Sequence, residues 1–107
     1  MAQDFTRYKN SSIGTTATTV FTSNSNDTIV GISIANITTS LVYASAYIND
    51  GSTNFYLVKN APIPAGSALQ VLDGGAKVVV QSGDILKVVS DTASSLDVWV
   101  STVDSIS

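Results

Sequence analysis

The chain has 107 residues, enough for one domain with a modest hydrophobic core, and it contains no cysteine, histidine or glutamate. These absences exclude disulfide scaffolds, Cys/His zinc sites and catalytic devices built on histidine or cysteine. Eight Asp stand against five Lys and Arg, for a net charge of −3, and the cations are too scattered for us to expect nucleic-acid binding.

Neither a membrane span nor a secretory signal is expected. Apolar runs are only about three residues long, as at Val78–Val80, far short of a transmembrane helix. Residues 1–7 are polar and lack the apolar region of a signal peptide, so we expect the chain to be made in a cytoplasm and to have no membrane partner.

The first twelve residues are polar and show no strand pattern, so we predict an N-terminal arm at 1–12 and a single domain at 13–107. In that domain, Val, Ile and Thr are abundant, which favours strands over helices. Turn-forming clusters recur at a spacing typical of a sandwich or small barrel. They delimit about eight predicted strands: 16–22, 28–38, 41–48, 54–60, 67–72, 76–81, 85–90 and 96–103.

Alternation of side chains predicts which face each strand buries. In residues 28–38 both parities are apolar, so this strand is predicted to be covered on both faces or to change partner along its length. In residues 41–48 small aliphatic side chains alternate with Tyr43 and Tyr47, which are predicted to lie on an outer or interface face. The apolar parity of residues 96–103 is predicted to be core, which places Trp99 on the outer face.

Two prolines indicate how the chain passes between sheets. Pro62 and Pro64 cannot donate ladder hydrogen bonds, so the segment around them is predicted to cross from one sheet to the other. The segment 82–84 is predicted to turn the chain into the next strand. The predicted fold is an all-β antiparallel sandwich, jelly-roll-like, with an immunoglobulin-like sandwich as the alternative.

No pattern of catalytic or metal-binding residues is present. The Asp residues lack the close spacing of a calcium loop, and no Ser-x-x-Lys or phosphate-binding glycine loop occurs. We therefore expect no enzyme, no cofactor and no metal site. Exposed Trp and Tyr are typical both of protein interfaces and of glycan-binding platforms, and the sequence leaves both open.

Several stretches carry a family resemblance. Residues 56–74, 77–88 and 94–101, with opening strands at 14–21 and 32–36, resemble small virion structural proteins of tailed bacteriophages, notably marine and cyanobacterial phages. The similar region covers residues 10–103, and its motifs are turn and strand signatures rather than a catalytic box.

The resemblance implies a virion location and two alternative roles. The first is a capsid decoration or cement protein that bridges major capsid subunits, as a trimer or dimer. The second is a neck, tail or fibre component, with host-receptor or glycan binding as a further role. In either role the expected partners are the major capsid protein or other virion proteins. The candidate interface residues are Phe5, Arg7, Tyr8 and Lys9 in the arm, and Tyr43, Tyr47 and Trp99 in the domain.

Overall fold

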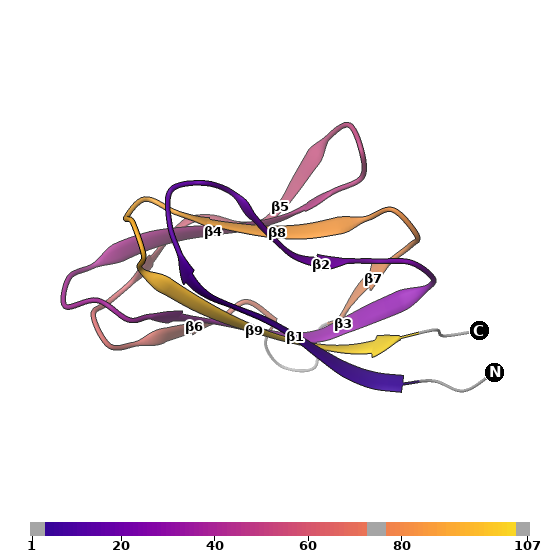
Figure 1. Cartoon of the computed structure of the whole chain (residues 1–107), viewed down its shortest axis with the longest axis horizontal. Coiled ribbons are helices and arrows are strands. Elements are labelled where there is room, and N and C mark those ends of the chain that lie inside the picture. Colours follow the sequence, from indigo (N-terminus) through magenta and orange to yellow (C-terminus); the bar gives the residue numbers. More distant parts are fainter. Residues whose placement is uncertain (1–3, 73–76, 105–107) are drawn as a thin grey trace.

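The computed structural model describes residues 4–72 and 77–104, which form a sandwich of two antiparallel sheets (Figure 1). Among these residues there are strands and turns but no helix. The strands are β1 (Asp4–Ile13), β2 (Thr18–Thr22), β3 (Asp27–Asn36), β4 (Val42–Asn49), β5 (Asn54–Ile63), β6 (Ala68–Gln70), β7 (Val78–Val80), β8 (Ile85–Ser90) and β9 (Leu96–Asp104). The predicted all-β antiparallel sandwich is confirmed, while the choice between jelly-roll-like and immunoglobulin-like connections stays a prediction.

The two sheets differ in strand number. The five-stranded sheet, called sheet A, has the order β1-β9-β3, and the far side of β3 pairs with both β6 and β7. The four-stranded sheet, called sheet B, has the order β2-β8-β4-β5. Strand β3 pairs with β7 through Asp27–Ile29 and with β6 through Ser33–Ala35, so the predicted change of partner along this strand is confirmed.

The expected arm is wrong for the described part of residues 1–12, because residues 4–13 form strand β1. This strand pairs antiparallel with β9, in regular register from Asp4↔Asp104 to Asn10↔Val98. Tyr8 anchors it, because its ring packs 4.4 Å from that of Phe21 and its hydroxyl donates a 2.8 Å hydrogen bond to Asp104. The sequence of β1 shows no alternation of apolar and polar residues, because this strand lies at a sheet edge and its inward side chains are largely polar and only half-buried.

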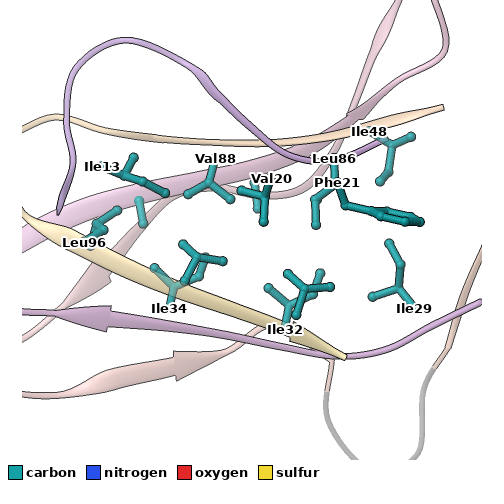
Figure 2. Close-up of a cluster of buried hydrophobic side chains, with 14 of the residues drawn as sticks. Ile13, Val20, Phe21, Ile29, Ile32, Ile34, Ile48, Leu86, Val88 and Leu96 are labelled. Atoms are coloured by element: carbon teal, nitrogen blue, oxygen red, sulfur yellow. The ribbon is translucent and has the colours of Figure 1, made fainter. Parts of the chain in front are cut away.

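The core fills the space between the two sheets (Figure 2). Ile32 and Ile34 from β3 and Val100 from β9 are fully buried, as are Leu86 and Val88 from sheet B. Along each strand these inward aliphatic side chains alternate with outward side chains, as expected for a sheet that is packed on one face and open to solvent on the other. The predicted inward parity of residues 96–103 is therefore confirmed.

The crossing between the sheets follows the prolines, as predicted. Pro62 lies in the edge strand β5, where a missing N–H is tolerated. The next residues form a turn in which the Ser67 N–H donates a 3.1 Å hydrogen bond to the Pro64 carbonyl and Gly66 has a φ of +71°. Strand β6 then joins sheet A.

Candidate functional site

The described residues contain neither a cluster of metal-ligating side chains nor a buried polar side chain without a hydrogen-bond partner. They include no group of three or more His, Cys, Asp or Glu side chains that could hold a metal ion. The described part of the chain also holds no helix long and apolar enough to cross a membrane. Its buried side-chain nitrogen and oxygen atoms all have hydrogen-bond partners.

One end of the outer face of sheet A carries a row of four side chains, three of them apolar, that crosses four strands. The register places Phe5 of β1 beside Val103 of β9, Val103 beside Thr28 of β3, and Thr28 beside Val79 of β7. Phe5 is 85% exposed and Val79 is 71% exposed, the two highest values among the large hydrophobic side chains that the structure describes. We call this set the apolar row. Apolar side chains so exposed on one face are typical of an interaction surface.

A second row crosses the same face further from the chain termini. Trp99 of β9 lies between Lys9 of β1 and Ser33 of β3, and Ser33 pairs with Gln70 of β6. Trp99 is 48% exposed, so its predicted outer position is confirmed. The guanidinium of Arg7 lies 5.5 Å from the centroid of the indole, which places a cation over the aromatic ring.

Small side chains occupy the middle of this face. Gly31 of β3 lies opposite Ser101 of β9, between the apolar row and the row that contains Trp99. A side chain built on Gly31 would meet only the Ser101 Cβ at 4.0 Å, so the surface here is low rather than crowded. The outer face of sheet A thus combines a flat centre with large apolar and aromatic groups around it.

The structure gathers four of the seven predicted interface residues on this face. Phe5, Arg7 and Lys9 of β1 are exposed on the same face as Trp99 of β9, although they belong to a strand and not to an arm. Tyr8 has the opposite parity and packs inward on Phe21, so its expected place in an exposed arm is wrong. Burial and the hydrogen bond to Asp104 raise the pKa of Tyr8 from its ordinary value of 10.0 to about 12.

The two remaining residues lie on sheet B, and only one of them is exposed. Tyr43 is 41% exposed on β4. Tyr47 has the same parity but only 7% of its surface is exposed, because the Tyr56 ring lies beside it with centroids 5.0 Å apart. The expectation that Tyr47 presents an interface is therefore wrong, since its neighbour on β5 covers it.

A groove that the sequence did not reveal lies beside Trp99 and has a volume of about 510 Å³. Three strands of sheet A line it, through Lys9, Asn10, Ser11, Ser33, Ala35, Asp97, Val98 and Trp99. These residues are far apart in the sequence, and only the pairing of β1, β9 and β3 brings them together. Outward parity on the three strands is the sole signal that could have linked most of them.

The chain matches no family model, no curated protein and no solved structure.

Proposed function

We propose that the chain is a non-enzymatic structural subunit of a phage virion, and that it binds neighbouring virion proteins through the outer face of sheet A. The single observation that carries this proposal is the apolar row, in which Phe5 and Val79 are largely exposed on the same face as Trp99. The virion context rests on the resemblance of residues 10–103 to small phage structural proteins.

The shape of the face supports binding to another protein. Small residues at its centre let the flat surface of a partner approach closely, and the apolar row would be removed from water on contact. Trp and Arg are among the residue types most often found as energetic anchors of interfaces, and here the Arg7 guanidinium lies over the Trp99 indole.

The first role we propose is capsid decoration, in which the subunit bridges major capsid proteins as a dimer or trimer. A binding contribution spread over a sheet face, with few charges, suits a protein that acts by adhesion. If the subunit is an oligomer, it can bind several capsid proteins of a symmetric shell at once, so that contacts that are weak individually give high overall affinity.

The second role is a neck, tail or fibre component that contacts a host receptor. The observation that favours it is the groove beside Trp99, because a decoration protein needs an adhesive face but no groove of small-molecule size.

Copy number separates the two roles. Quantitative mass spectrometry of purified virions of the encoding phage would compare this chain with the major capsid protein. We expect a ratio close to stoichiometric, or a simple fraction of it, for a decoration protein. A handful of copies per particle would favour the neck, tail or fibre role, and absence from purified virions would overturn the virion proposal.

A further inference from the structure

The groove beside Trp99 has the size and composition of a small-ligand site. Its volume of about 510 Å³ falls within the range of roughly 300–1,000 Å³ that such sites occupy. It lies at the end of the face away from the apolar row. There Ala35 of β3 is the register partner of Asp97 on the neighbouring strand β9, and both residues are only partly exposed. The short Ala35 side chain leaves room next to the much larger indole.

One wall of the groove is aromatic and open. The Arg7 guanidinium lies over Trp99 at 5.5 Å from the ring centroid, whereas the residues that line the groove include Trp99 but not Arg7. A half-exposed indole offers a flat apolar surface on which the C–H face of a sugar ring can stack.

The remaining groups offer hydrogen bonds of both kinds. Asp97 accepts a 3.0 Å hydrogen bond from the Ser12 N–H through Oδ1, which orients the carboxylate and leaves Oδ2 as an acceptor. Gln70 donates a 3.1 Å hydrogen bond to Ser33 Oγ, so the Ser33 hydroxyl keeps its own proton for donation. Lys9 and Ser11 add an ammonium and a hydroxyl on the β1 side.

We propose that this groove binds a neutral sugar unit of a glycan, which stacks on Trp99 and bonds through its hydroxyls to Asp97, Ser33 and Lys9. The lining contains one cation and one carboxylate, and this balance of charge favours an uncharged polyol over a phosphate or an acidic polymer. A peptide fits less well, because a bound segment of chain requires a series of pockets and this groove has a single aromatic wall. The inference does not depend on the virion role.

The fluorescence of the protein provides a direct test, because Trp99 is the only tryptophan in the chain. The purified full-length protein would be titrated with methyl glycosides of glucose, galactose, mannose and N-acetylglucosamine, and with maltotriose and chitotriose. We expect a saturable change in emission for at least one of these sugars, with a Kd of about 1 mM, typical of a shallow site.

Two variants and a matched control locate the site. Ala35→Leu fills the groove while it retains Trp99 as reporter, and Asp97→Asn retains an acceptor for the Ser12 N–H but removes the charge. Each is expected to weaken binding at least about tenfold, a loss of about 1.4 kcal/mol. Ala65→Leu, the same change in an exposed turn outside the groove, is expected to leave binding unaltered. Melting curves would confirm that all three variants fold.

Three results would overturn the inference. The first is an emission that stays constant with every sugar at concentrations up to roughly 50 mM, well above a millimolar Kd. The second is an equal response in the wild type and in folded Ala35→Leu. The third is an emission change caused by the purified major capsid protein but by no sugar, which would make the groove part of the protein interface. None of the three contradicts the virion role, which the copy number tests separately.

Discussion

Two outward-pointing aromatic side chains, Trp99 on sheet A and Tyr47 on sheet B, differ sharply in how much of their surface is exposed to solvent. On sheet A, Trp99 stands between Lys9 and Ser33 and remains half exposed. On sheet B, Tyr47 has the same outward parity but is sealed beside Tyr56. The parity of a strand therefore fixes the face on which a side chain lies, while the neighbouring strands decide whether it meets solvent.

The edge strands of the two sheets, β5 in sheet B and β1 in sheet A, also differ in how regularly they pair with their neighbours. Strand β5 shifts register twice against β4, and at the irregularity Asn60 has a φ of +51° and donates its N–H to Ser45 Oγ at 2.9 Å. Part of β5 also rises away from the layer of β4 and β8 (Figure 1). On the same strand, the Lys59 ammonium lies 5.0 Å from the centroid of the Tyr56 ring. Bulges and lysines protect an edge against further pairing. Strand β1, the edge of sheet A, is more regular, because it pairs with β9 in unbroken register from Asp4 to Asn10, although it also carries the exposed Lys9.

The largest expected effect comes from removal of residues 1–9, which takes away most of β1. Deletion uncovers the edge of β9 and removes the packing of Tyr8 on Phe21. We expect the free energy of unfolding to fall by several kcal/mol, a large part of the roughly 5–15 kcal/mol of a typical domain. Urea denaturation followed by circular dichroism would measure the loss. A truncated chain as stable as the whole one would show that these residues are an arm after all.

The buried tyrosine on sheet B gives the next largest effect. Tyr47→Ala should lower the free energy of unfolding by about 3 kcal/mol, because it leaves a cavity beside Tyr56. The matched change Tyr43→Ala, on the same strand and the same face, should cost less than about 1 kcal/mol because Tyr43 is exposed. Chemical denaturation of both variants measures the difference, and equal losses would contradict the contrast between covered and open aromatics.

A smaller effect on stability is expected at Tyr8, which lies in the edge strand β1 of sheet A. Tyr8→Phe removes the hydrogen bond to Asp104 and should cost about 1 kcal/mol at neutral pH. Because folding raises the pKa of Tyr8, its neutral form is favoured in the folded state. The contribution of the hydroxyl is therefore fully present below about pH 10 and is lost as the pH rises towards 12.

Melting temperatures of the wild type and Tyr8→Phe, measured across this alkaline range, provide the test. The two curves should approach each other above about pH 10. If the difference between the two melting temperatures stays constant up to pH 12, the pKa of the Tyr8 hydroxyl is the same in the folded and unfolded chains.

The smallest effect on stability is expected at Trp99. Trp99→Ala should change the free energy of unfolding by less than about 1 kcal/mol, because the side chain is half exposed on the outer face. It should nevertheless weaken assembly with virion proteins, since Trp is a frequent anchor of interfaces. A marked fall in melting temperature with unchanged assembly would place Trp99 in a structural role instead.

Much of the fold follows from local patterns in the sequence. The turn clusters located eight of the nine strands of the described residues to within a few positions, and the prolines located the crossing from β5 to β6. The inward set at Leu96, Val98 and Val100 followed from simple alternation. Strand β1 was missed because an edge strand with half-buried polar side chains carries little apolar signal.

The candidate site was less predictable, because it depends on which strands lie side by side. Trp99 was placed on the correct face, but the apolar row and the groove arise only from the order β1-β9-β3 and its register. The burial of Tyr47 depends on the bulged partner strand β5, which no alternation within β4 could reveal.

The central claim is that sheet A, and not sheet B, presents the association surface. The most direct test compares incorporation into virions of the double variant Phe5→Ser/Val79→Ser with that of Tyr43→Ser/Phe55→Ser, after melting curves have shown that both fold. Each variant removes two exposed large hydrophobic side chains, the first pair from sheet A and the second from sheet B. The account predicts that the first variant is largely lost from purified particles while the second is retained. Retention of the first and loss of the second would contradict it.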